Sequence, residues 1–200
     1  MLSVDARQEK AVKRLLNIHS VIACSRVNGP GSRLVVFFQG CKRRCQGCFN
    51  PETHPIKRAN LYTPEEIFHK YLKEGTEGIT VSGGEPFLQP EGLLALLKEA
   101  RKQGLSTVVY TGYRYEELLS LKETPLIFEH LDVLVDGEFR MEEKEESLLA
   151  RGSKNQRLFF LSSRYSLEDF YMDGKVELII NPDGTVVTTG FEAIQKNETP

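Results

Sequence analysis

Three cysteines with short spacings lie in the segment CKRRCQGC, residues 41–48. These residues, Cys41, Cys45 and Cys48, bring three thiols to one point from a single loop. Thiolates ligate iron–sulfur clusters, and a cubane cluster offers four irons for ligation. Three local ligands leave one iron open, and an open metal position is where chemistry takes place. The segment therefore predicts a cluster that is held by three cysteines and keeps one reactive position.

A second chemical motif is Gly83-Gly84-Glu85-Pro86, which directly follows the short apolar run Ile79-Thr80-Val81. Glycines let the backbone approach a ligand closely and adopt positive φ. The carbonyls of the two glycines and the carboxylate of Glu85 suit the ammonium group of an amino acid. Taken alone, this motif is a common turn.

The composition is that of an ordinary single globular domain, with 200 residues, 40% hydrophobic, 27% charged and a net charge of −2. This charge balance gives no reason to expect a nucleic-acid partner. The longest apolar runs are strand-length, far below the roughly 18 residues of a membrane helix, so we expect no membrane partner. Residues 1–20 lack the pattern of a secretory signal, so we expect a cytoplasmic protein.

Apolar periodicity and turn residues predict the elements that position these motifs. Strands are expected over 34–39, 79–81, 107–110, 131–135 and 157–161, helices from 64, over 90–103 and over 115–121, and a hairpin from 175–180 and 185–189. Thr63, Pro64 and Glu66 form a predicted capping box and helix start. Residues 1–20 are expected to be a helical extension, and residues 21–200 a single domain.

Strands that alternate with helices indicate parallel βαβ units with right-handed crossovers. There are too few strands for a closed eightfold barrel. The expected fold class is therefore α/β, an incomplete and laterally open parallel barrel with a C-terminal β-hairpin. By analogy with closed barrels, the chemistry is expected at the C-terminal ends of the strands.

The cysteine spacing, followed 35 residues after Cys48 by the glycine motif, resembles the radical S-adenosylmethionine (SAM) superfamily. The resemblance implies a 4Fe-4S cluster on Cys41, Cys45 and Cys48, with SAM on the open iron. It also implies cofactor binding by Gly47 and by the glycine motif, which would hold the methionine amino group.

Four further motifs narrow this resemblance, although each alone is an ordinary turn. They are Gly29-Pro30-Gly31-Ser32-Arg33, Tyr110-Thr111-Gly112-Tyr113, the segment 132–137 and the segment 151–157. In this order, from about Val27 to Leu158, they resemble the activating proteins of anaerobic ribonucleoside-triphosphate reductase, which are glycyl-radical-enzyme activases. The resemblance implies that Thr111, Asp136 and Asn155 bind the cofactor.

The same resemblance implies a radical SAM oxidoreductase. One electron from a flavodoxin or ferredoxin passes through the cluster and cleaves SAM into methionine and a 5′-deoxyadenosyl radical. That radical then takes a hydrogen atom from a glycine of the anaerobic reductase. Beyond the cluster and SAM, no catalytic residue is expected, because the cofactor carries the radical chemistry.

Two other functions stay open on the sequence. The first is a radical SAM enzyme that activates a different glycyl-radical enzyme or modifies a peptide or small molecule. The second is a non-catalytic iron–sulfur or zinc carrier with Cys24 as fourth ligand, although we expect Cys24 to be a buried apolar residue. Lys42, Arg43 and Arg44 are either a solvated turn or cations that influence the cluster potential or a docking face.

Overall fold

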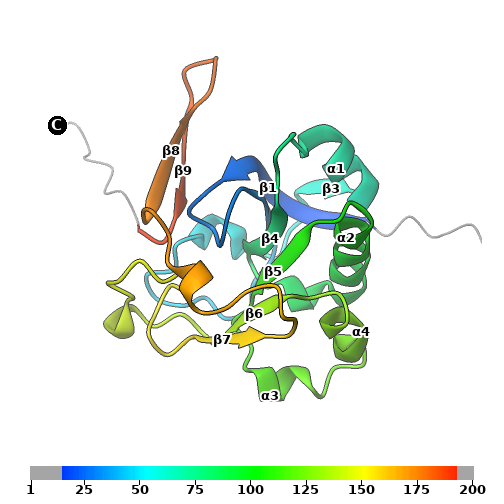
Figure 1. Ribbon diagram of the computed structural model, residues 1–200, viewed down its shortest axis with the longest axis vertical. Helices are drawn as coiled ribbons and strands as arrows, with labels where there is room; N and C mark the ends of the chain where they lie inside the picture. Colours follow the sequence, from blue (N-terminus) through cyan, green and yellow to red (C-terminus); the bar gives the residue numbers. More distant parts are fainter. Residues whose placement is uncertain (1–14, 193–200) are drawn as a thin grey trace, which may run out of the picture.

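The computed structural model describes residues 15–192 (Figure 1). The strands are β1 (Leu16–Ser25), β2 (Arg33–Phe38), β3 (Asn60–Tyr62), β4 (Gly78–Gly83), β5 (Ser106–Tyr110), β6 (Val133–Asp136), β7 (Arg157–Phe160), β8 (Val176–Ile180) and β9 (Val186–Gly190). The α-helices are α1 (Pro64–Tyr71), α2 (Pro90–Lys102), α3 (Tyr115–Leu118) and α4 (Thr124–Phe128). Short 3₁₀ turns are η1 (Pro51–Thr53), η2 (Pro86–Leu88), η3 (Met141–Glu143) and η4 (Glu168–Phe170).

The main sheet has seven strands in the order β3-β1-β2-β4-β5-β6-β7, and β8 and β9 form a separate antiparallel pair. At its centre β2, β4, β5 and β6 are parallel. The predicted α/β class is therefore confirmed as a mixed fold with a largely parallel sheet. Within residues 15–192, no helix is both long and apolar enough to span a bilayer.

Both faces of the central strands are covered, so all six residues of β2 are buried. Leu34, Val36 and Phe38 belong to the core that also contains the apolar residues of α1 and α2. Val35 and Phe37 point to the opposite face, because successive side chains of a strand alternate. Phe37, on this second face, lines the cavity that contains the candidate site.

The start of α1 confirms the predicted capping box. Glu66 N donates to Thr63 Oγ1 over 3.2 Å, and Thr63 N donates to Glu66 Oε2 over 2.8 Å. These reciprocal bonds satisfy two donors that a helix start otherwise leaves unpaired.

The expected helical extension differs from the structure where residues are described. Residues 16–20 begin β1, which pairs with both β2 and β3. Leu16 and Ile18 are fully buried, and Asn17 and His19 between them are less so, which is the two-residue period of a strand. The first fourteen residues of the expected extension lie outside the described part of the chain.

The last strand of the sheet, β7, also departs from the expected parallel arrangement. It runs antiparallel to β6, with Asp136 opposite Arg157 and Val133 opposite Phe160. Consequently the start of β7, rather than its end, lies beside the C-terminal ends of β4, β5 and β6.

Arg33, the first residue of β2, lies at the opposite end of the sheet from the cysteine loop. Its side chain is fully buried. Its guanidinium donates to oxygens of Pro30, Ile79, Thr80, Ser106 and Tyr165. All of these acceptors are neutral, so hydrogen bonds alone satisfy the buried cation here.

Candidate iron–sulfur and cofactor site

The cysteine loop leaves β2 at its C-terminal end, where Gly40 has φ +101°. Backbone bonds then fix the loop, since Cys41 N donates to the carbonyl of His54 over 3.1 Å and Cys48 N to that of Cys45 over 3.3 Å. Arg44 has φ +52°, in the left-handed region that is uncommon for a residue with a side chain. The loop is therefore tightly turned around its three cysteines.

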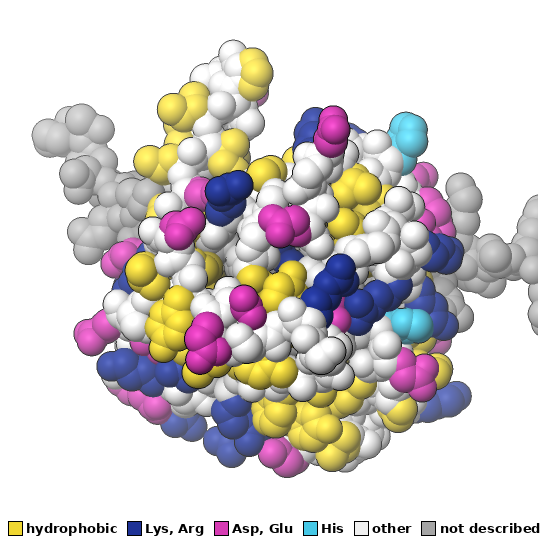
Figure 2. Space-filling view, in the orientation of Figure 1, with side chains coloured by type: hydrophobic (Ala, Val, Ile, Leu, Met, Phe, Trp, Pro, Cys, Tyr) yellow, Lys and Arg dark blue, Asp and Glu magenta, His cyan; other side chains and the backbone are white. Residues whose placement is uncertain are grey.

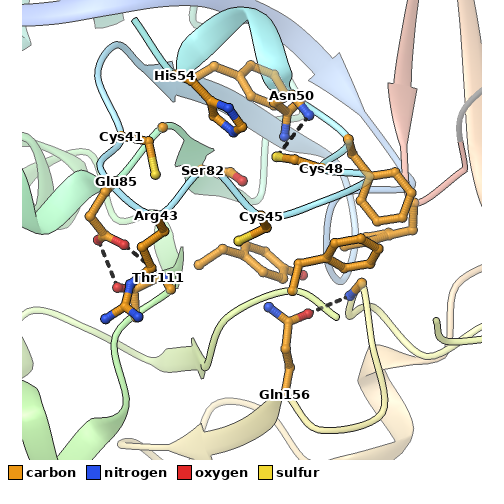
Figure 3. A pocket seen from close by; sticks show the side chains of 18 of the residues that line it. Cys41, Arg43, Cys45, Cys48, Asn50, His54, Ser82, Glu85, Thr111 and Gln156 are labelled. Atoms are coloured by element: carbon orange, nitrogen blue, oxygen red, sulfur yellow. Dashed lines mark hydrogen bonds between the residues drawn. The ribbon is translucent and has the colours of Figure 1, made fainter. Parts of the chain in front are cut away.

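Cys41, Cys45 and Cys48 line one cavity of about 110 Å³, together with Glu85 and Thr111. Figure 3 shows the three sulfur atoms projecting into this space from the loop. All three are free thiols. Within residues 15–192, no three His, Cys, Asp or Glu side chains already stand at metal-binding geometry.

The donor set of this cavity nevertheless fits the predicted cluster. Burial and, to a smaller extent, the carboxylate of Glu138 together raise the pKa of the Cys45 thiol to about 11. Burial also raises the pKa of Cys48. Metal binding is coupled to the deprotonation of thiol ligands, so iron would bind here with release of these protons. Three soft sulfur ligands on one loop suit iron–sulfur chemistry.

Glu85 lies at the wall of the cavity and is only 2% exposed. Its Oε1 accepts hydrogen bonds from Thr111 Oγ1 over 2.8 Å and Phe87 N over 3.0 Å, and its Oε2 accepts from Gly112 N over 2.8 Å. Burial raises the pKa of the carboxyl, and these three hydrogen bonds oppose that rise. Glu85 thus connects the turn after β4 to the turn after β5.

The glycine motif also has a packing role, besides the approach to a ligand that its sequence predicts. Gly83 has φ +99°, and a side chain there would meet the backbone of Phe37 and Phe38. A side chain at Gly84 would overlap the carbonyl oxygen of Gly40. The two glycines therefore let the end of β4 lie against the start of the cysteine loop. Pro86 is buried and begins η2.

A second cleft, of about 210 Å³, adjoins the cysteine cavity and shares Arg43, Gly112 and Gly137 with it. Asp136 and Asn155 line this second cleft and not the first. Asp136 is fully buried and accepts hydrogen bonds from Arg157 and from Tyr115 N. The structure therefore separates these two predicted residues from the cysteines by one shared wall.

Gly47, in the cysteine loop, has φ +69° and packs close to Met141, since an added side chain would lie 2.8 Å from the sulfur of that residue. Its position between Cys45 and Cys48 makes the reversal of the loop possible.

Arg43 is a site residue whose orientation the sequence left open. Its guanidinium lies 4.4 Å from the ring centre of Tyr113 and pairs with Glu117 over 3.3 Å and Glu138 over 3.8 Å. Among the described residues, its Nε is buried without a hydrogen-bond partner, and so is Asn155 Oδ1. Buried polar atoms are rarely left unpaired, so both atoms are available to a water molecule or a polar ligand.

Sequence reasoning also missed Gln156, His54 and the aromatic wall of the cavity. Gln156 Oε1 accepts from Gly152 N over 2.8 Å, and its Nε2 donates to the carbonyl of Gly137 over 2.8 Å. Phe49 and Phe139 pack with ring centres 4.9 Å apart. For the aromatic wall, only the position of Phe49 directly after Cys48 gave a signal, because Phe139 comes from a distant segment.

Cys24 is exposed, so the expectation of a buried apolar residue is wrong. The pairing of β1 with β2 shifts register between Ile22 and Ser25, and such a bulge re-aims the side chains within it. The thiol of Cys24 lies 3.3 Å from the hydroxyl of Ser32, at the start of β2. Cys41 follows the other end of that strand, roughly 20 Å away at the rise of a β-strand.

Comparisons with known proteins agree with this site. Residues 27–159 match the family described as 4Fe-4S single cluster domain. The chain is 32% identical over 153 residues to the anaerobic ribonucleoside-triphosphate reductase-activating protein of Enterobacteria phage T4, covering 72% of this chain and 94% of that protein. The protein of the same name from Escherichia coli K12 is 33% identical over 151 residues, covering 70% and 96%.

A further relative is the pyruvate formate-lyase-activating enzyme of Clostridium pasteurianum, which is 42% identical over 128 residues. That match covers 58% of this chain, which spans about half (53%) of the longer enzyme. A crystal structure of QueE from Escherichia coli aligns with a TM-score of 0.40 at 17% identity, covering 49% of this chain and 52% of that one.

The cysteine loop on a parallel-rich α/β sheet and the family match define an iron–sulfur protein of the 4Fe-4S single cluster class. More particularly, the chain belongs to the radical SAM family of glycyl-radical-enzyme activases. This membership confirms the predicted cofactors, a 4Fe-4S cluster and SAM.

Proposed function

We propose that this protein activates anaerobic ribonucleoside-triphosphate reductase by generating a glycyl radical on it. The observation that carries the proposal is the shared cavity of Cys41, Cys45, Cys48 and Glu85 at the C-terminal end of the parallel strands. The relatives with that name are covered over 94% and 96% of their lengths, which supports this substrate. Held by Cys41, Cys45 and Cys48, a reduced cluster would supply the one electron for cleavage of SAM to methionine and the radical that takes a hydrogen atom from the glycine.

The residues of the two clefts divide the work of holding the cofactors. Cys41, Cys45 and Cys48 would hold three irons as thiolates. The carbonyls of Gly83 and Gly84 and the carboxylate of Glu85 would receive the amino group of SAM, with Pro86 and Gly47 shaping the turns around it. The positive charge of that ammonium group would also stabilise the ionised form of the buried Glu85.

The second cleft would hold the remaining polar groups of SAM. The positive charge of Arg43 faces Glu85, so a bound amino acid would place its carboxylate toward Arg43 and its ammonium toward Glu85. The unpaired Asn155 Oδ1 would accept a hydrogen bond from a ribose hydroxyl. Thr111 and Asp136 would act indirectly, Thr111 through Glu85 and Asp136 by fixing Arg157 and the turn before Tyr115.

We propose further that the sheet is the wall of an incomplete, laterally open barrel, in which a protein loop reaches the cavity from the side. The aromatic residues Phe49, Phe139 and Tyr110 would limit the entry of water there. A cytoplasmic flavodoxin or ferredoxin is proposed as the electron donor, with neither nucleic acid nor membrane as a partner.

A second candidate function is the activation of another glycyl-radical enzyme, which the 42% identity to a pyruvate formate-lyase-activating enzyme favours. Both candidates predict SAM cleavage, and they differ in the protein that acquires the radical. The exposed position of Cys24 beyond the far end of β2 argues against the carrier with four cysteine ligands.

The test is electron paramagnetic resonance of the anaerobically reconstituted and reduced protein, with and without SAM. We expect a cluster signal that changes when SAM is added, followed by a glycyl radical on the anaerobic reductase from the same genome. A signal that SAM leaves unchanged would contradict radical SAM chemistry. A radical that appears only on pyruvate formate-lyase would favour the second candidate.

A further inference from the structure

The hairpin of β8 and β9 projects from the body of the molecule (Figure 1). Its strands pair Leu178 with Thr188 and Ile180 with Val186. The turn between them is held by Asn181 N, which donates to the carbonyl of Thr185 over 2.9 Å. The hairpin is thus an ordered element with two distinct faces.

One face is fixed against the body. Ile179 packs on the core of Ile22, Val35 and Phe37, on the face of β2 that carries Phe37 toward the cavity. On the same face, Glu177 Oε1 accepts from Arg26 N over 2.9 Å, and Thr189 Oγ1 accepts from Asn28 Nδ2 over 2.8 Å. These contacts determine which side of the hairpin points outward.

The outward face is apolar. Leu178, Ile180 and Val186 alternate with the anchored residues, and their exposed fractions are 61%, 75% and 57%. Figure 2 shows hydrophobic side chains along the projecting hairpin. Contiguous apolar residues on an exposed face mark protein interaction sites. The outer strand edges also offer backbone groups for pairing with another chain.

The base of the hairpin is part of the cavity wall. Gly190 and Phe191 line the cavity that contains the three cysteines. Phe191 packs against Tyr110 with ring centres 5.7 Å apart and against Phe49 at 6.4 Å, and its N donates to the carbonyl of Lys175 over 2.7 Å. A protein that presents a loop to this cavity must therefore lie beside the hairpin.

The hairpin also lies beyond residue 159, where the match to the iron–sulfur family ends. It is an addition at the rim of the cavity rather than a part of the matched cluster domain. Such a position suits the recognition of one particular substrate protein.

We propose that the outer face of the hairpin, formed by Leu178, Ile180 and Val186, docks the protein substrate and holds its glycine-bearing loop at the cavity. This inference rests on the proposed function, because it requires the substrate to be a protein. The occupant is the glycyl-radical reductase, because its glycine-bearing loop has to enter the cavity whose wall includes Gly190 and Phe191 at the base of the hairpin. A second copy of this chain is the competing occupant.

The experiment uses the full chain with reconstituted cluster and the purified anaerobic reductase from the same genome. Replacing Leu178→Glu and Ile180→Glu together places two charges on the apolar face. We expect the reductase to bind at least about tenfold more weakly. Cleavage of SAM by chemically reduced protein without reductase should stay within about twofold of the unchanged protein.

The matched control is Leu119→Glu with Leu126→Glu, a pair of exposed leucines near α3 and α4 with exposed fractions of 58% and 46%. This control should leave reductase binding unchanged. A milder pair, Leu178→Ser with Ile180→Thr, should weaken binding in the same direction without adding charge. Circular dichroism melting should show the same transition for every variant, because the replaced side chains are exposed.

The outcomes separate the two hypotheses. If the unchanged protein cleaves no SAM, the proposed function fails. If it cleaves SAM and both hairpin variants bind the reductase with unchanged affinity, the docking proposal is overturned. The proposal is also overturned if sedimentation shows a dimer that the hairpin variants dissociate while reductase affinity stays the same, because a second copy then covers this face.

Discussion

Thr111 Oγ1 donates a hydrogen bond to Glu85 Oε1 over 2.8 Å, which joins the residue after β5 to the turn after β4. Gly112 N completes the link by donating to the other carboxylate oxygen. Two strand ends that are distant in sequence are thus held by one buried carboxylate. This part of the cavity wall is therefore held together by Glu85, which accepts hydrogen bonds from three donors.

Replacing Glu85→Gln should destabilise the protein and weaken SAM binding together. An amide has only one acceptor oxygen, so at least one of the donors Thr111, Phe87 N and Gly112 N would lose its partner or face another donor. We expect a loss of about 1–3 kcal/mol in the free energy of unfolding. Urea unfolding measures this loss, and the exposed Glu74→Gln variant is the control. Equal midpoints for the two variants would refute the bridging role.

Arg43 should distinguish SAM from its decarboxylated analogue. If Arg43 holds the carboxylate, Arg43→Gln should raise the Kd for SAM by about tenfold, which is about 1.4 kcal/mol. The Kd for decarboxylated SAM should change by less than about twofold, because the interacting group is absent. Anaerobic calorimetry on the cluster-loaded protein measures both values. Equal weakening for the two ligands would assign Arg43 a structural role only.

Glu145 should make stability depend on pH in acid. Burial opposes ionisation of this carboxyl, but hydrogen bonds from Arg151 and Ser147 outweigh it and lower its pKa to about 2. Because the pKa in the folded state lies below the ordinary value near 4.5, its contribution is complete above that value and is lost as pH falls toward 2.

The Glu145→Gln variant should therefore lose about 2 kcal/mol at pH 7 and less at pH 2.5. Urea unfolding at a series of pH values checks this difference. A constant loss across the series would show that packing, not ionisation, is responsible. The result bears on the site because Glu145 N donates to the carbonyl of Gly152, a residue that lines the cysteine cavity.

Replacement of the four cysteines, one at a time, should have different effects on the cluster content of the reconstituted protein. Cys41→Ala, Cys45→Ala or Cys48→Ala should each remove most of the bound iron and sulfide, because each supplies one ligand. Cys24→Ala should leave both unchanged, since that thiol lies beside Ser32 at the other end of β2. Iron and sulfide analysis with visible absorbance measures the effect. A cluster that survives in any of the first three variants would contradict the assigned ligands.

The predictable parts of this protein are those coded by local spacing. The cysteine loop, the Gly83–Pro86 turn and the capping box of Thr63 and Glu66 each depend on residues that are close in sequence. The structure gathers Cys41, Cys45, Cys48 and Glu85 around one cavity, as the two motifs indicate.

The features that sequence reasoning missed arise from long-range pairing. The strand β1 gains its partners from β2 and β3, and a bulge in that pairing exposes Cys24. Arg43 takes its orientation from Tyr113, Glu117 and Glu138, which lie 70 to 95 residues away in the chain. No local pattern carries such contacts.

The reversed direction of β7 has a consequence for how this architecture can be extended. A parallel sheet grows by adding one helix and one strand, each new strand ending at the same edge. A strand of the opposite direction ends that series, so no further parallel unit can continue from β7 without a second reversal. The chain continues instead to the hairpin of β8 and β9, whose base lines the cavity. Changes in the length of this tail would therefore alter the rim of the cavity and leave the pairing of the parallel strands as it is.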